Sequence, residues 1–343
     1  MRLSRILRSR RMAAGRGGGS DGISCTLAEL LALRHTARSL SVKGGKPAWS
    51  IMAGSQLSRF RGRGMDYSES RIYTPGDDIR QIDWRVTART GKLHTKLYTE
   101  ERDRPILLLL DFSPSLYFGT REALKSVIAA RLAATISWTA IFNSDRIGAI
   151  LLSPTNRFEL RPSGGRRGAL RVIRALVEAS RDLPRQQSEM RLQTLVQQGL
   201  RTIRPGSRIF LLSDFFALYP QLEADLARLR RHNDLVLCHL IDPLELAPPP
   251  PGLYRITDGR QRARLDTRNQ EVAAAWRERF ASRREQLGKV AGNLGVPRLE
   301  MVSGDDLAGV MRQGLSFGFG RATARNNGQA NNSDPLASNG VGP

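Results

Sequence analysis

One carboxylate and two hydroxyls stand at alternate positions of this chain, at Asp111, Ser113 and Ser115. They follow residues 106–110, an unbroken aliphatic run that is typical of a strand covered on both faces. In open α/β sheets, ligands bind just beyond the carboxyl ends of such strands. Carboxylate and hydroxyl oxygens are hard ligands of the kind that Mg²⁺ prefers. The spacing therefore predicts a binding site for Mg²⁺, or for Mn²⁺ in its place.

A second strand end supplies another carboxylate. Asp214 follows the aliphatic run at residues 208–212 just as Asp111 follows the first run. If the two strands are parallel neighbours, about 4.8 Å apart, both carboxylates reach the same edge of the sheet. Water would complete the metal's shell and leave one position to which a partner protein's carboxylate could bind. The alternative is that Ser113 and Ser115 belong to a turn that only caps the following helix.

The elements that must position these residues alternate between strands and helices. We expect buried strands at residues 106–110, 147–152, 208–212, 235–241 and 297–302, and helices at residues 121–142, 168–179, 190–203, 221–231, 272–287 and 305–312. Antiparallel pieces are expected at 157–160, beside the strand at 147–152, and as a hairpin at 254–265. This alternation implies right-handed crossovers and an α/β fold with a doubly wound, mainly parallel sheet of Rossmann type. The helix at 121–142 is aliphatic at every fourth position and has few charges, so we expect deep burial.

Composition divides the chain into four parts. We expect a disordered basic arm at 1–22, an N-terminal helix with a small β-rich segment at 23–105, the sheet domain at 106–315, and a disordered tail at 316–343. Helical spacing covers 23–40, and β-like pieces lie at 72–74 and 92–99. Pro75-Gly76 predicts a turn, since proline presets one backbone angle and glycine tolerates the next.

The charge of the chain favours anionic partners. The net charge is +22 and the first twenty residues hold six arginines and no acid. The alternative function is therefore binding of nucleic acid or an anionic surface through an arginine-rich surface. Few aromatic residues lie among the basic ones, however, and the arm could equally be a solvated tail.

Several classes of protein are not supported. Two cysteines, Cys25 and Cys238, do not make a disulfide framework, and no apolar run approaches the roughly 18–20 residues of a membrane span. Without a secretory h-region, we expect a cytoplasmic protein. The chain has no phosphate-binding Walker motif, no nucleophile elbow and no histidine pair at zinc spacing. A metal-dependent hydrolase would need a positioned base or a second metal, so we expect no enzyme.

The strand-end residues resemble a known metal site. Asp111, Ser113 and Ser115 match the first loop of the metal-ion-dependent adhesion site of the von Willebrand factor A-like fold, and Asp214 matches its third loop. That family's second loop normally supplies a threonine. Here residues 184–189 offer only Ser188 as a hydroxyl, so this chain departs from the pattern at that ligand.

A second resemblance narrows the family. The run Arg71, Tyr73, Pro75-Gly76-Asp77-Asp78, Arg80 and Ile82-Asp83-Trp84 resembles the bacterial "domain of unknown function 58" family, whose members often accompany MoxR-type AAA+ ATPases. The resemblance implies a non-catalytic, Mg²⁺-dependent protein-interaction module. It would be an adaptor that works with a MoxR-type AAA+ ATPase in the assembly or maturation of a client protein.

The same signature run allows two physical interpretations. Asp77 and Asp78 can accept backbone amides or pair with Arg80 and Arg85. Trp84 offers a large anchoring surface. The cluster therefore either fixes the N-terminal segment to the sheet domain or forms part of a surface that docks a partner.

Overall fold

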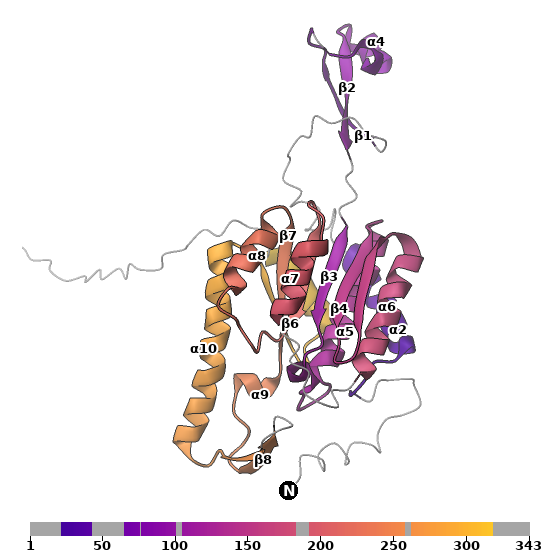
Figure 1. Cartoon of the computed structure of the whole chain (residues 1–343). Coiled ribbons are helices and arrows are strands. Elements are labelled where there is room, and N and C mark those ends of the chain that lie inside the picture. Colours follow the sequence, from indigo (N-terminus) through magenta and orange to yellow (C-terminus); the bar gives the residue numbers. More distant parts are fainter. Residues whose placement is uncertain are drawn as a thin grey trace, which may run out of the picture.

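A six-stranded sheet forms the centre of the molecule (Figure 1). The structure is a computed structural model and describes residues 22–42, 65–75, 77–100, 105–182, 192–257 and 262–317. The strand order is β10-β7-β6-β3-β4-β5. The strands are β3 (Ile106–Asp111), β4 (Ile147–Leu152), β5 (Arg157–Ser163), β6 (Arg208–Ser213), β7 (Asp234–Ile241) and β10 (Arg298–Val302). Within this sheet β4 and β5 are antiparallel and the other neighbours are parallel, which confirms the expected α/β fold.

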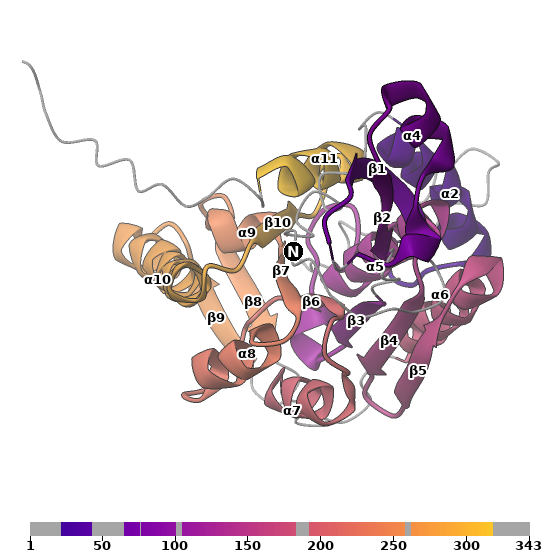
Figure 2. The ribbon, with the colours of Figure 1, turned by 90° about the horizontal axis from the view of Figure 1, so that it is seen from above.

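Helices cover both faces of the sheet (Figure 2). One face carries α2 (Leu27–Val42), α5 (Lys125–Phe142), α6 (Gly165–Arg181) and α11 (Leu307–Phe317), and the other carries α7 (Leu192–Thr202), α8 (Leu222–Arg230) and α10 (Gln270–Leu294). Leu108 and Leu110 of β3 pack into the first core, whereas Leu109 packs into the second. Because each strand buries both faces, its sequence is aliphatic without polar alternation.

Helix α5 is buried along its length, as predicted, because α2 covers its outer side. The Trp138 indole donates a hydrogen bond to the Leu30 carbonyl at 3.0 Å, and Arg131 pairs with Glu29 at 2.6 Å. The predicted start of this helix was wrong: it begins at Lys125 instead of residue 121. The preceding residues form a loop whose Thr120 is bound by Asp242, beyond the end of β7.

Helix α10 is longer than predicted. The expected end at residue 287 was wrong, because the helix continues to Leu294 and ends at Gly295, which has a left-handed φ of 55°. Gly288 follows the expected end directly but does not interrupt the helix. One glycine costs a helix only about 1 kcal/mol, and Leu287, Ala291 and Leu294 bury an apolar face beyond it.

The described residues between 65 and 100 form a separate small unit, which Figure 1 shows standing away from the six-stranded sheet, whereas α2 belongs to the sheet domain. The unit pairs β1 (Met65–Ile72) with β2 (His94–Glu100), and contains the short helices η1 (Ile79–Gln81) and α4 (Trp84–Thr90). The sequence did not predict α4, which begins where Asp83 accepts a hydrogen bond from the Val86 amide at 3.2 Å. Trp84 is 66% exposed, so its ring does not anchor this unit to the sheet.

Residues of the signature run between Arg71 and Trp84 stabilise the turn of this unit. Asp77 accepts the Thr74 amide at 3.0 Å and pairs with Arg71 at 2.6 Å. Asp78 accepts the Arg80 amide at 3.0 Å. The expectation that these aspartates accept backbone amides is confirmed, whereas the ion pair of Asp77 is made with Arg71 instead of Arg80 or Arg85.

The remaining elements are short. They are η2 (Pro114–Tyr117), α9 (Pro243–Leu246) and the predicted hairpin, β8 (Leu253–Thr257) with β9 (Arg262–Asp266). In the described part of the chain, no helix is both long enough and apolar enough to cross a bilayer.

The order of the strands creates a natural binding position. From β3 the chain moves to β4 and β5 on one side, and then returns to β6 on the other side of β3. In open α/β sheets, ligands bind at the carboxyl ends of the strands where the order reverses in this way. In this sheet the reversal lies between β3 and β6.

Close packing of α6 against β5 gives a first prediction. A Cβ added at Gly168 would lie 2.1 Å from the Ser163 carbonyl oxygen. We expect Gly168→Ala to lower the free energy of unfolding by about 1–3 kcal/mol, the usual cost of overpacking. Gly292 of α10 has no atom within 4 Å of such a Cβ, so Gly292→Ala should raise stability by up to about 1 kcal/mol. Urea denaturation would contradict this reasoning if both variants changed stability in the same direction.

Candidate functional site

Oxygen-bearing side chains from two neighbouring strands meet at the switch point of the sheet. Leu110 of β3 lies opposite Leu212 of β6, so Asp111 and Asp214 reach the same edge. The Ser113 and Ser115 hydroxyl oxygens lie 2.9 Å apart, and Ser115 donates a hydrogen bond to Asp214 Oδ1 at 3.1 Å. The structure thus brings together four of the five residues that the sequence predicted, which we call the oxygen cluster: Asp111, Ser113, Ser115 and Asp214. The fifth, Ser188, lies outside the described residues.

The two serines are not explained by helix capping. Ser113 precedes η2 but makes no side-chain hydrogen bond to its amides. The residue before α5 is Leu124, which has no capping side chain. The two hydroxyls contact each other, and Ser115 also contacts Asp214, so the alternative of a simple capping turn does not account for their positions.

Asp111 is a buried carboxylate with an unsatisfied oxygen. Its residue is 2% exposed, and Oδ1 has no hydrogen-bond partner among the described residues. Burial and the charge of Asp214 raise the pKa of Asp111 to about 7, although hydrogen bonds from Ser113 and Ser213 oppose the increase. Buried polar atoms normally have partners. A bound cation would supply one for Asp111 Oδ1.

Lys125 is a functional candidate that the sequence analysis missed. Its ammonium lies 2.7 Å from Asp214 Oδ2 and 2.7 Å from Glu245 Oε1, and the residue is 1% exposed. Burial alone would lower the pKa of Lys125, but the two carboxylates outweigh it and raise that pKa above its ordinary value. The pKa of Asp214 is lowered in turn, because Lys125 outweighs the effect of burial. The available signal was a lysine at the start of a largely apolar helix whose other charged residue is Arg131.

A third strand end anchors Glu245. Asp242 follows β7 and is fully buried, and it accepts hydrogen bonds from the Thr120 amide at 2.9 Å and the Thr120 hydroxyl at 2.6 Å. The Asp242 amide donates to Glu245 Oε2 at 3.0 Å, while Oε1 of the same carboxylate faces Lys125. An aspartate after an aliphatic strand is the same pattern that identified Asp111 and Asp214, so the sequence did contain this signal.

The backbone after Asp214 adopts an unusual conformation. Phe215 has a φ of 48°, a left-handed value that is uncommon for a bulky residue. The turn places Phe215 in the core, edge-on to His239 at 5.8 Å, and leaves Phe216 exposed. The Phe216 amide donates to Asp214 Oδ1 at 3.1 Å. Strain of this kind persists where the surrounding structure imposes it, and it is frequent at functional sites.

The oxygen cluster fits a small hard cation. In the described part of the chain, no three histidine, cysteine, aspartate or glutamate side chains group into a metal site. The donor set here combines two carboxylates with two hydroxyls, which suits Mg²⁺ or Mn²⁺. Lys125 contacts Oδ2 of Asp214, whereas Oδ1 faces Ser115. Asp111, Ser113 and Ser115 are therefore the residues best placed to hold the ion.

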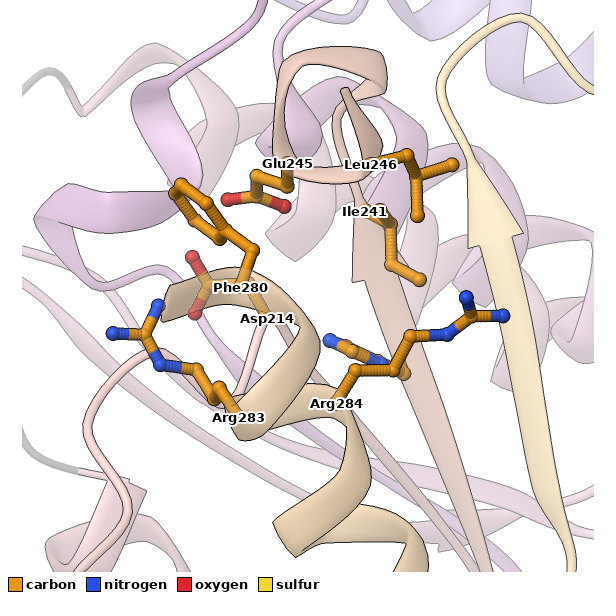
Figure 3. Close-up of a pocket in the computed structure, with 8 residues that line it drawn as sticks. Asp214, Ile241, Glu245, Leu246, Phe280, Arg283 and Arg284 are labelled. Atoms are coloured by element: carbon orange, nitrogen blue, oxygen red, sulfur yellow. The ribbon is translucent and has the colours of Figure 1, made fainter. Parts of the chain in front are cut away.

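A pocket adjoins the oxygen cluster (Figure 3). It is lined by Asp214, His239, Ile241, Glu245, Leu246, Phe280, Arg283 and Arg284. Figure 3 shows Phe280 and Arg283 of α10 on one side, facing Asp214 and Glu245. The pocket therefore lies between the carboxylates of Asp214 and Glu245 and the basic and aromatic side chains of α10.

Comparison with known proteins identifies relatives over most of the chain. Residues 69–288 match the model of the family described as "Protein of unknown function DUF58". The uncharacterized protein Rv1480 of Mycobacterium tuberculosis is 26% identical over 269 residues, which cover 76% of this chain and 82% of that protein. The uncharacterized protein Mb1516 of Mycobacterium bovis matches with the same identity and coverage.

Three solved structures are similar at low TM-scores. The conserved hypothetical protein BatB from Bacteroides thetaiotaomicron is 13% identical with a TM-score of 0.40, over 62% of this chain and 97% of that chain. An aerotolerance-related membrane protein from Bacteroides fragilis is 13% identical with a TM-score of 0.38, over 62% and 96%. A von Willebrand factor type A structure from Catenulispora acidiphila is 13% identical with a TM-score of 0.31, over 66% and 44%. The fold of this chain is therefore assigned from its own strand order.

Proposed function

This chain belongs to the DUF58 family of proteins of unknown function, and we propose that it is a non-catalytic, Mg²⁺-dependent protein-interaction module. The observation that supports this proposal most directly is the unpartnered Oδ1 of buried Asp111, beside two hydroxyls that make no cap. These oxygens lie at the switch point of the sheet, where such folds bind ligands.

Each residue of the oxygen cluster has a distinct role in this proposal. Asp111, Ser113 and Ser115 hold the ion, and Asp214 orients Ser115 by accepting its hydrogen bond. Lys125 compensates the charge of Asp214 and so keeps this buried edge from accumulating negative charge. When bound, the ion supplies a positive centre to which a carboxylate of a partner protein can bind.

The site offers little for catalysis. The Lys125 ammonium is held between two carboxylates and is 1% exposed, so it is not available as a nucleophile or base.

The chain's net charge of +22 keeps nucleic acid or an anionic surface as the alternative partner. The pocket beside the oxygen cluster favours a protein instead, because Leu246 in its lining is 44% exposed and offers apolar contact that suits a protein partner.

The family resemblance motivates the choice of partner. We propose that the chain is an adaptor for a MoxR-type AAA+ ATPase in the assembly or maturation of a client protein. The test is capture of a purified MoxR-type ATPase from the same organism by the immobilised full chain. Capture should be strong in Mg²⁺, and should fall at least tenfold in EDTA and in Asp111→Ala, because each removes the ion.

A matched variant controls for a general effect of charge. Asp266 of β9 is half-buried and pairs with Arg268 at 2.6 Å, so Asp266→Ala should capture the ATPase as well as the wild type does. Equal capture by wild type and Asp111→Ala, or equal capture with and without Mg²⁺, would overturn the proposed function. Calorimetric titration of Mg²⁺ into each protein would show separately whether the ion binds.

A further inference from the structure

Arg283 of α10 is a cation without a polar partner at the edge of the pocket. Its guanidinium lies 4.2 Å from the centroid of the Phe216 ring and 5.6 Å from that of Phe280. Within the described ranges, no hydrogen bond or ion pair satisfies its N–H groups. Aromatic faces stabilise a guanidinium but leave its donors unused. Arg283 is therefore fixed in place with its donor edge free.

The neighbouring Arg284, unlike Arg283, has its donors satisfied by a carboxylate. Arg284 binds the Glu300 carboxylate through two nitrogens, and Arg298 lies 3.0 Å from the same carboxylate. Burial and the charge of Arg279 lower the pKa of Arg283, although Asp214 and Glu245 act in the opposite direction. These two carboxylates are thus close enough to act on Arg283 through space, but they are committed to Lys125.

The surroundings select the kind of anion. The pocket is small and open to solvent, and its lining includes Asp214 and Glu245. A singly charged carboxylate is repelled by these residues less than a phosphate would be. Phe216 and Leu246 are 43% and 44% exposed beside the pocket and offer apolar contact. A phosphate gains nothing from apolar contact with Phe216 and Leu246, whereas an apolar side chain of a protein partner does.

We propose that Arg283 binds a carboxylate of a partner protein, either an aspartate or glutamate side chain or a chain end. An adjacent apolar side chain of the partner would pack on Phe216 and Leu246. The planar guanidinium can donate two parallel hydrogen bonds to a carboxylate. Because Phe216 and Phe280 already hold the guanidinium, little side-chain entropy is lost on binding. This inference rests on the proposed function for the partner being a protein, but it does not require the ion.

Selection from a phage-displayed library of random dodecapeptides on the full chain tests the inference. Selections run in Mg²⁺ and in EDTA, on wild type, Arg283→Met and Asp111→Ala. We expect peptides that combine an acidic residue with an apolar neighbour from wild type and Asp111→Ala in both buffers, and their loss from Arg283→Met. Selected peptides without acidic enrichment would overturn the inference.

Fluorescence anisotropy with one enriched peptide then measures the effect. Arg283→Met should weaken binding about tenfold or more, as expected for hydrogen bonds to a charged group. Arg283→Lys should recover only part of the affinity, because it keeps the charge and loses the fork. Arg279→Met, an exposed arginine one turn away on α10, is the control and should change binding less than about twofold. Changing the acidic residue of the peptide to its amide should match the loss in Arg283→Met.

Two outcomes separate this inference from the proposed function, and a third tests the choice of anion. Acidic peptides that require Mg²⁺ and disappear in Asp111→Ala, while Arg283→Met retains them, would place the carboxylate on the ion and overturn the inference alone. Peptide binding that depends on Arg283 in EDTA would support the inference even if Mg²⁺ never binds. Displacement of the peptide by inorganic phosphate at lower concentration than by acetate would overturn the choice of a carboxylate.

Discussion

Replacing Lys125 by methionine should lower the free energy of unfolding by about 3–5 kcal/mol at neutral pH, the usual cost of removing one partner of a buried ion pair. Methionine fills similar space but leaves Asp214 and Glu245 without their shared cation. Urea denaturation measures the loss. Lys289→Met is the matched control, because Lys289 pairs with Glu285 on the exposed side of α10 and should contribute less than about 0.5 kcal/mol.

The dependence of this effect on pH follows from the raised pKa of Lys125. The folded protein holds the proton more tightly than the unfolded chain does, so the stabilisation is present below the ordinary pKa of 10.5. It is lost as pH rises through the higher pKa of the folded state. Wild type and Lys125→Met should therefore differ throughout the neutral range and converge only in strongly alkaline solution.

Mg²⁺ should partly restore the stability of Lys125→Met. Without the ammonium, both oxygens of Asp214 become available, and a ligand that binds only the folded state raises stability with its concentration. The rise in melting temperature on adding Mg²⁺ should be larger for Lys125→Met than for wild type. Equal stability of the two proteins in EDTA would contradict the role assigned to the buried ammonium.

Asp111→Asn should abolish Mg²⁺ binding and yet stabilise the metal-free chain at pH 8. Burial and Asp214 raise the pKa of Asp111 from 3.8 to about 7, so at pH 8 its ionised form is held in an unfavourable place. A pKa difference of this size corresponds to a cost of about 4 kcal/mol. Asparagine carries no charge, and since its amide also needs partners, we expect a gain of about 2–4 kcal/mol.

The pH dependence of this gain in stability distinguishes the removal of a charge from a general stabilisation of the fold. Between about pH 4 and pH 7 the folded wild type holds a proton on Asp111 that the unfolded chain has released. The contribution of Asp111 to stability is therefore highest below this window and falls as pH rises through it, whereas Asp111→Asn should lack this decline. Urea denaturation at pH 5 and pH 8 in EDTA measures both proteins. A variant less stable than wild type at pH 8 would show that Asp111 is not strained by its charge.

Asp111→Asn should thus lose Mg²⁺ binding and gain stability in the absence of the ion, which means that the binding residue destabilises the metal-free fold. Sites that bind charged ligands often hold groups that destabilise the empty protein, and substitutions that remove them stabilise the fold while activity is lost. Asp266, a half-buried carboxylate away from the oxygen cluster, gives the comparison. The pKa of Asp266 is lowered by Arg268, so Asp266→Asn should bring no such gain.

The sequence by itself determined which elements form and which residues end them. The aliphatic run before Asp111 required burial on both faces, and the helices and strands that alternate after it required a mainly parallel sheet. These are local signals, because periodicity and the absence of charge report directly on burial. The short helix α4 escaped prediction, since seven largely polar residues carry no such periodicity.

Only the tertiary structure decided which strand ends meet. Ser115 and Asp214 are 99 residues apart, and Lys125 and Glu245 are 120 residues apart. Their contacts exist because β6 lies between β3 and β7 and so brings the ends of these strands to one edge of the sheet, and no local pattern encodes that order. The apolar sequence of α5 indicates that Lys125 is buried, but nothing in the sequence identifies Asp214 and Glu245 as the carboxylates beside it. Likewise, the free donor edge of Arg283 follows from the two phenylalanines that hold it, one from α10 and one from the strained turn after β6.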